Sequence, residues 1–131
     1  MKKTGIINAP ISTVIAELGH MDTLTIADAG LPIPKEVQRI DLALMQGIPG
    51  FIDTLRVVLS EIQVEKVIVA DEMKQISPVI LTEVQSLLSD IPVDFVPHQS
   101  FKELTKSTRV IIRTGEFTPY ANIILISGVV F

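Results

Sequence analysis

Thr23-Leu24-Thr25-Ile26-Ala27-Asp28-Ala29-Gly30-Leu31-Pro32-Ile33-Pro34 joins an apolar segment to a carboxylate and then to a loop rich in glycine and proline. The β-branched and apolar residues from Thr23 to Ala27 predict a buried strand. Asp28 stands where this strand ends, and the glycine and prolines after it predict a turn. Because ligands of α/β sheets gather at the carboxyl ends of strands, the stretch predicts a central strand and a polar site together.

A helix is predicted just before this strand. Asn8 can cap it, and Pro10 suits its first turn. Its apolar side chains recur with helical spacing at Ile11, Val14, Ile15 and Leu18. Gly19 can close the helix, which leaves His20 just beyond its end.

Strands and helices alternate along the rest of the chain. Further strands are predicted at Arg39 to Leu44, Val64 to Ala70, Val93 to Val96, Arg109 to Arg113 and Ile123 to Val130. Helical spacing is seen at Phe51, Leu55, Val58, Leu59 and Ile62, and again after Ser77-Pro78 at Ile80, Val84, Leu87 and Leu88. Ser100 and Glu103 have capping-box spacing, which predicts a short helix directly after His98.

This alternation predicts an α/β fold, a single three-layer α/β/α domain spanning residues 1–131. The last two strands have no helix between them, so the sheet is expected to be mixed and mostly parallel.

The chain carries a net charge of -4 with scattered Lys and Arg, which argues against nucleic acid as a partner. Its apolar runs are too short for a membrane span, and it has no cysteine, so a cytoplasmic protein is expected.

Hydrophobic residues make up 47% of the chain. That much apolar surface is hard to bury in so small a monomer, which favours a symmetric homo-oligomer.

The chain has two histidines, His20 and His98, and each stands where an apolar segment gives way to polar residues. An imidazole can give or take a proton near neutral pH. With no cysteine, metal-ligand cluster or phosphate loop beside them, proton transfer on a small polar substrate is the predicted chemistry. His20 is the first candidate for catalysis, with Asp28 and His98 as its partners.

Each candidate also has a purely structural interpretation. His20 can be a helix C-terminal histidine favoured by the macrodipole, and Asp28 can cap its own turn. Lys102 can be a solvated helix residue. Tyr120 and Asn122 suit the hydroxyls of a sugar, but they can equally be a packed sheet corner and a backbone-bonded amide.

Several short motifs in one order resemble the D-ribose pyranase family, the ribose mutarotases, along essentially the whole chain. They are Met1-Lys2-Lys3, Leu18 to Thr23, Asp28 to Pro34, Arg39 to Leu44, Arg113 to Glu116 and Pro119 to Leu125. The resemblance implies interconversion of the β-pyranose and β-furanose forms of D-ribose, with no cofactor and no metal. It further implies a cytoplasmic decamer of two stacked pentameric rings.

Carried over by position, the resemblance makes His20 the proton donor. Asp28, His98 and the Tyr120-Ala121-Asn122 segment become substrate-binding residues. Lys102, expected in the first turn of the helix after His98, is added to them independently of the resemblance. If Thr23 to Ala27 is extended, a rise of about 3.3 Å per residue puts His20 and Asp28 roughly 20 Å apart or more. One pentose cannot bridge that gap, so a site shared between two subunits is expected.

Other functions fit the same residues. A fucose mutarotase would share the layout, although Ala29 to Pro34 looks more like the ribose branch. A non-catalytic sugar-binding subunit would use the same polar groups without needing an imidazole that transfers protons. A purely structural ring protein is a third alternative.

Overall fold

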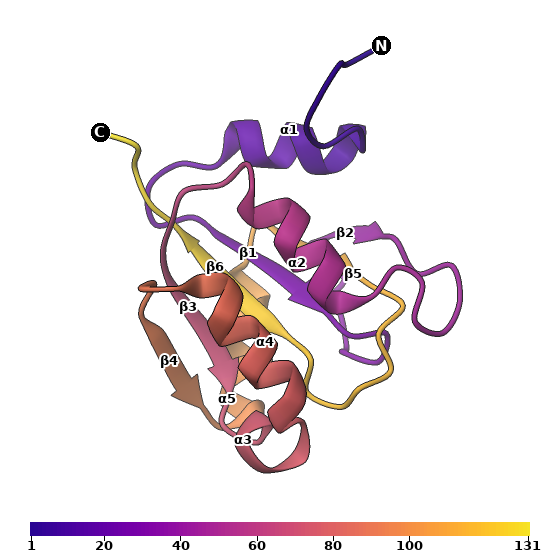
Figure 1. The fold of residues 1–131 in the computed structure, drawn as a ribbon, viewed down its shortest axis with the longest axis vertical. Helices are drawn as coiled ribbons and strands as arrows, with labels where there is room; N and C mark the ends of the chain where they lie inside the picture. Colours follow the sequence, from indigo (N-terminus) through magenta and orange to yellow (C-terminus); the bar gives the residue numbers. More distant parts are fainter.

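Six strands form one sheet in the computed structural model, which describes residues 1–131 (Figure 1). In chain order they are β1 (Thr23–Ala27), β2 (Gln38–Asp41), β3 (Val64–Ala70), β4 (Val93–Val96), β5 (Val110–Arg113) and β6 (Ile123–Ser127). Their order across the sheet is β2-β5-β1-β6-β3-β4. Only β6 runs antiparallel to its neighbours, β1 and β3. The other strands therefore all end at the edge where β6 begins.

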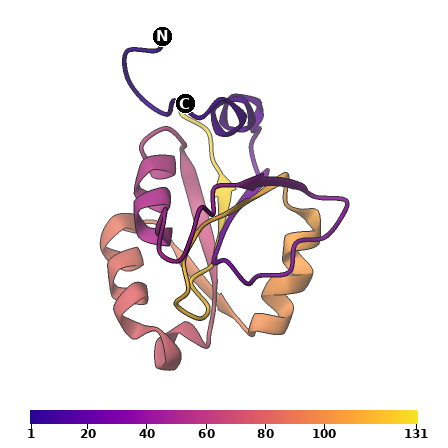
Figure 2. The same cartoon turned by 90° about the vertical axis from the view of Figure 1, so that its right-hand side faces the viewer.

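Helices cover both faces of this sheet. They are α1 (Ala9–Glu17), α2 (Phe51–Leu59), α3 (Met73–Ile76), α4 (Pro78–Leu88) and α5 (His98–Leu104), which runs into the short 3-10 turn η1 (Thr105–Ser107). Figure 2 shows α2 and α4 on one face and α5 on the other, with α1 and both termini at one end of the molecule. The predicted three-layer α/β architecture with a mixed, mostly parallel sheet is confirmed.

The two faces of the sheet carry separate cores, because side chains alternate along each strand. Towards α2 and α4, the larger core includes Leu24, Ile26, Val67, Val69, Ile112, Leu125, Leu55 and Val84. Towards α5, a smaller core gathers Ala27, Leu31, Val37, Phe101, Ile111 and Ile124. Phe101 is fully buried there. It is the side chain by which the short helix α5 is anchored to the sheet.

The predicted end of the first helix is wrong. α1 ends at Glu17, and its C-cap Leu18 is already extended, whereas Gly19 donates its N–H to Asp22 Oδ2 at 2.9 Å. The Gly19 N–H is therefore bonded to Asp22 and does not bond a carbonyl at the end of the helix.

Two strand ends are also shorter than predicted. β2 ends at Asp41, not Leu44, because the next residues form a tight turn in which Leu44 N–H donates to Ile48 O at 3.0 Å. β6 ends at Ser127. Beyond it only Gly128 N–H bonds across, to Gln63 O at 2.9 Å, so no ladder continues to Val130.

The predicted capping box of α5 does not form. The helix begins at His98 itself, with Pro97 at the N-cap position and no side-chain cap. The His98 N–H is instead satisfied by both oxygens of Glu72, at 3.1 and 2.9 Å. A carboxylate from the end of β3 therefore replaces the local cap.

The inner face of α4 is rotated slightly from the predicted stripe. Leu81, Val84 and Leu88 are buried, whereas Ile80 and Leu87 only flank the core. The four-residue helix α3, at Met73–Ile76, was not predicted, since one turn carries too little periodicity to detect. None of the helices combines the length and the apolar character that crossing a membrane requires.

Candidate active site

The topology brings three of the predicted site residues to one pocket. Asp28 follows β1, His98 follows β4, and Tyr120 precedes the antiparallel strand β6. All three therefore lie at the same edge of the sheet. They line a pocket of about 270 Å³ together with Gly30, Leu31, Pro32 and Pro119. A cavity of this size suits a small polar molecule.

Asp28 is held by its own turn and by Asn122. Its Oδ1 accepts the N–H groups of Gly30 and Leu31 at 2.9 and 2.8 Å, so the turn-capping interpretation of Asp28 is correct. Its Oδ2 accepts Asn122 Nδ2 at 2.9 Å. Asn122 is fully buried, and in this position it orients Asp28 rather than lining the pocket.

His98 packs between two aromatic rings. Tyr120 meets it edge-on at 4.9 Å between ring centroids, and Phe101 stacks at 6.2 Å. Burial of the ring, followed by the positive charge of Lys102, holds the pKa of His98 below its ordinary value of 6.5, although Glu72 and Asp28 act in the opposite direction. The ring is therefore neutral at neutral pH and able to accept a proton.

Only one nitrogen of His98 is available for that exchange. Nδ1 is buried and has no hydrogen-bond partner, so Nε2 is the atom left to act. Tyr120 adds a phenol beside it and adopts a left-handed backbone with φ of 63°. This conformation is uncommon for a bulky residue and typical of functional loops.

The remaining two substrate-binding candidates, Lys102 and Ala121, do not line the pocket. Lys102 stands one turn after His98 on α5 and does not line the pocket; it acts on His98 through its charge. Ala121 is fully buried in the larger core, so only its backbone is available to a ligand.

A second pocket of about 380 Å³ adjoins the first and shares Asp28, Gly30 and Pro119 with it. Glu116 lies in it. Burial by itself would raise the pKa of Glu116, but hydrogen bonds from the hydroxyl and N–H of Thr118 and from the Phe51 N–H outweigh this effect and leave it below its ordinary value. Glu116 is thus negatively charged at neutral pH in the pocket that adjoins the His98 pocket.

His20 does not belong to this pocket. It lies before β1, at the opposite edge of the sheet, and its Nε2 is 2.7 Å from Glu65 Oε2. The interpretation of His20 as part of the helix terminus is wrong, because α1 ends three residues earlier. Within one chain, therefore, the structure brings Asp28, His98 and Tyr120 together and leaves His20 apart.

Sequence reasoning missed three carboxylates at these sites. Glu65 contacts His20, Glu72 caps His98, and Glu116 lines the neighbouring pocket. In the sequence, Glu72 follows Asp71 and precedes Lys74 by two residues, a pattern typical of a solvated charge cluster. Glu65 and Glu72 act on partners more than twenty residues away, which no local pattern reveals. Glu116 bonds the distant Phe51 N–H as well as the nearby Thr118.

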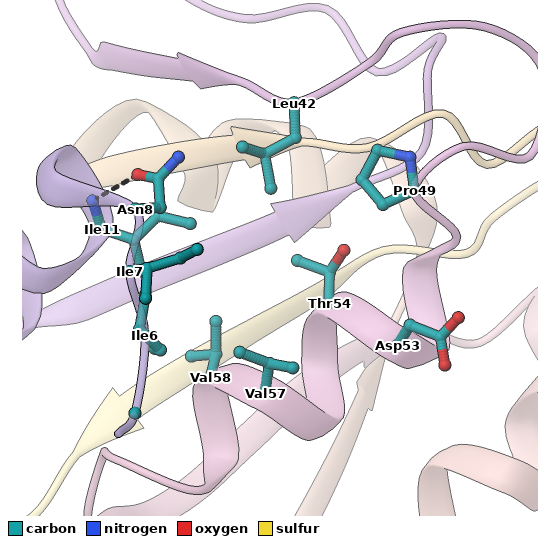
Figure 3. Close-up of a pocket in the computed structure, with 11 residues that line it drawn as sticks. Ile6, Ile7, Asn8, Ile11, Leu42, Pro49, Asp53, Thr54, Val57 and Val58 are labelled. Atoms are coloured by element: carbon teal, nitrogen blue, oxygen red, sulfur yellow. Dashed lines mark hydrogen bonds between the residues drawn. The ribbon is translucent and has the colours of Figure 1, made fainter. Parts of the chain in front are cut away.

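A further pocket, of about 300 Å³, opens between the start of α1 and α2 (Figure 3). Its lining is mainly aliphatic, and Asn8 is already engaged as the cap of α1 through Ile11 N–H. Asp53, its only ionisable residue, pairs with Arg56 at 2.7 Å. This pocket is mainly aliphatic and contains no histidine, so it offers less for proton transfer near pH 7 than the His98 pocket.

Fold and site together define a three-layer α/β protein with an acid–base pocket at the carboxyl edge of its sheet. The family model described as the RbsD / FucU transport protein family matches residues 1–130, and the chain belongs to this family. It is 56% identical to a D-ribose pyranase of Laribacter hongkongensis and 57% identical to one of Coprothermobacter proteolyticus. Each alignment covers 100% of both chains. The resemblance drawn from the sequence motifs is confirmed.

Solved structures agree with this assignment. Bacillus subtilis RbsD complexed with D-ribose matches with a TM-score of 0.97 and 48% identity, over 100% of each chain. The fucose mutarotase of Streptococcus pneumoniae, in complex with L-fucose, matches with a TM-score of 0.83 over 95% of each chain. At 22% identity, this second likeness extends to the fold alone.

Proposed function

We propose that this protein interconverts the β-pyranose and β-furanose forms of D-ribose by opening and closing the sugar ring. The observation that carries the proposal is the pocket that joins a neutral His98 to Asp28 and Tyr120, in a chain with full-length identity of 56% to a D-ribose pyranase. The reaction needs proton transfer and positioning, and the pocket supplies groups for both.

Ring opening requires two proton transfers. A base removes the proton of the anomeric hydroxyl while an acid protonates the ring oxygen, and the bond between the anomeric carbon and the ring oxygen breaks. Closure on a different hydroxyl reverses both transfers. We assign the donor role to His20 and the acceptor role to His98 or Asp28, with Tyr120 holding the sugar hydroxyls.

This assignment requires two copies of the chain at each site. His20 and Asp28 lie at opposite ends of the extended strand β1, and a pentose is too small to reach both. The His98 pocket of one subunit must therefore be completed by a neighbouring subunit, through the sheet edge at which that neighbour carries His20.

Exposed apolar side chains lie near the His98 pocket and near His20, and they support this arrangement. Beside the His98 edge stand Leu44, Met45, Ile48 and Phe117, and beside His20 stand Met21, Val129, Val130 and Phe131. The two surfaces differ, so their contact is head-to-tail, and repeated head-to-tail contacts form a ring where the rotation between neighbours closes. This agrees with the decamer of two pentameric rings, acting in the cytoplasm, that the family resemblance implies.

Saturation-transfer NMR of D-ribose at equilibrium tests the function. The protein should accelerate exchange between pyranose and furanose signals, and His20→Ala should remove about 10² to 10⁴ of that acceleration without changing the fold. His98→Ala should weaken ribose binding as well as rate, since it acts in the ground state.

The same experiment separates the alternatives. A protein that ribose stabilises against heat without faster exchange would be a sugar-binding subunit and not an enzyme. Acceleration of L-fucose exchange above that of D-ribose would move the assignment to the fucose branch.

A further inference from the structure

His20 and Glu65 form a contact between two elements that are distant in sequence. Nε2 of His20 lies 2.7 Å from Oε2 of Glu65, a separation of 45 residues along the chain. Both side chains are about half exposed, at 51% and 53%. Ion pairs this exposed usually contribute little to the free energy of unfolding. We therefore ask whether the contact affects the chemistry of His20.

The backbone on both sides of the contact is fixed. Glu65 stands at the one irregularity of the β3–β6 ladder, between the pairs Val64–Ser127 and Lys66–Ile126. A bulge of this kind redirects a side chain and is common beside active sites. A Cβ on Gly128 would lie 3.2 Å from the Cβ of Glu65, so the glycine leaves room for Glu65.

The turn that carries His20 is held equally well. Met21, at φ of 70°, donates its N–H to Ser127 O at 2.9 Å, and Asp22 Oδ2 accepts the Gly19 N–H. Ser127 N–H in turn donates to Asp22 O at 2.8 Å. With the backbone of His20 fixed by β6, the contact with Glu65 fixes the orientation of its ring.

A carboxylate also selects the tautomer of a histidine. An ionised carboxylate only accepts hydrogen bonds, so the nitrogen that faces Glu65, Nε2, must carry a proton. In the neutral ring, Nδ1 is then bare and can receive a proton; in the charged ring, Nδ1–H can donate one. An orienting carboxylate plays the same part in other histidine-based sites.

We infer that Glu65 is a positioning residue for catalysis: it holds His20 with Nε2 protonated, so that Nδ1 is the atom that exchanges protons with the sugar. The inference rests on the proposed role of His20. Glu65 itself does not touch the substrate.

Histidine NMR tests the inference directly, because the chain contains only two histidines. In protein labelled with ¹⁵N-histidine, the neutral ring of the wild-type His20 should show the Nε2–H tautomer. Glu65→Ala should move its signals to the mixture of a free imidazole. Glu65→Gln keeps the shape of the side chain, but its amide can present either oxygen or nitrogen, so it too should show a smaller share of the Nε2–H tautomer than the wild type. The His98 signals are the internal reference.

Kinetics of ribose exchange supply the second readout. Both Glu65 variants should lower kcat by about 10-fold, the lower end of what orienting partners of histidine contribute, and leave KM unchanged. Asp94→Asn is the matched control, because it neutralises a similarly exposed carboxylate that pairs with Lys66, the next residue of β3. It should alter neither the tautomer nor the rate.

The possible failures are distinct. A normal tautomer and kcat in the Glu65 variants, with His20→Ala inactive, would overturn the inference and leave the pair as a surface ion pair. Loss of assembly in Glu65→Gln, seen by sedimentation, would also overturn it, because Glu65 would then act on the oligomer. Full activity of His20→Ala would refute the role of His20 itself, and the inference with it.

Discussion

Asn122 and Asp28 are joined by two reciprocal hydrogen bonds although they stand 94 residues apart. The Asp28 N–H donates to Asn122 Oδ1 at 2.8 Å, and Asn122 Nδ2 donates to Asp28 Oδ2 at 2.9 Å. A single buried amide therefore holds both the backbone and the carboxylate of Asp28. This relation connects the start of β6 to the end of β1, at the edge where the pocket opens.

Asn122→Ala should both destabilise the protein and weaken ribose binding. The change leaves the Asp28 N–H without its partner, which costs about 1 to 3 kcal/mol in free energy of unfolding. Urea unfolding and the ribose-induced rise in Tm measure the two effects. Asn8→Ala, which removes the cap of α1, should cost about 1 kcal/mol and leave ribose affinity unchanged. Wild-type ribose affinity in Asn122→Ala would show that Asp28 needs no such support.

Lys102→Gln should raise the pKa of His98, because removing a positive charge favours the protonated ring. An NMR titration of the His98 ring measures this shift. Lys106→Gln is the control, since Lys106 pairs with Glu103 at 2.7 Å and should leave His98 unchanged. An unchanged His98 midpoint in Lys102→Gln would contradict the prediction.

The lowered pKa of His98 also predicts a pH dependence of stability. A histidine that is harder to protonate when folded contributes its stability fully above its ordinary pKa of 6.5 and loses it as the pH falls through the lowered folded value. His98→Gln should therefore flatten the stability profile below about pH 6.5, as followed by urea unfolding across that range.

Glu116→Gln should lower stability at pH 7 and weaken its dependence on acid. The folded pKa of Glu116 lies below its ordinary value of 4.5, so its contribution is present above 4.5 and disappears as the pH falls through the folded value. Glu103→Gln, at a surface ion pair, is the matched control. If the two variants show the same pH profile, the hydrogen bonds from Thr118 and Phe51 have no effect on stability.

Hybrid assemblies test the shared active site. Subunits carrying His20→Ala and subunits carrying Asn122→Ala should each be inactive alone, yet mixed assemblies should regain part of the exchange activity. Recovery is expected because an interface with wild-type His20 on one side and wild-type Asn122 on the other forms in the mixture. If mass spectrometry verifies the hybrids and no activity returns, both residues act within the pocket of one chain.

The sequence alone was sufficient for the order of elements. Buried strands such as Thr23–Ala27 and Val64–Ala70 were predicted with their observed bounds, since runs of β-branched and aliphatic residues between turn signals leave few alternatives. The ends of several helices and strands were predicted less well. The closing of α1 and the start of α5 were decided by Asp22 and Glu72, whose hydrogen bonds replace the expected caps.

The sequence by itself also determined which residue types were available for the chemistry: two imidazoles, the strand-terminal Asp28 and a single tyrosine. Composition and spacing did not group these residues; only the family resemblance placed Asp28, His98 and Tyr120 in one site. The extended strand Thr23–Ala27 already separated His20 from Asp28, but only the tertiary structure decided that the antiparallel strand β6 carries Tyr120 to His98 and Asp28. The physical reason is that composition and periodicity depend on near neighbours in the chain, whereas a site is set by strand order and direction, which depend on packing over the whole sheet.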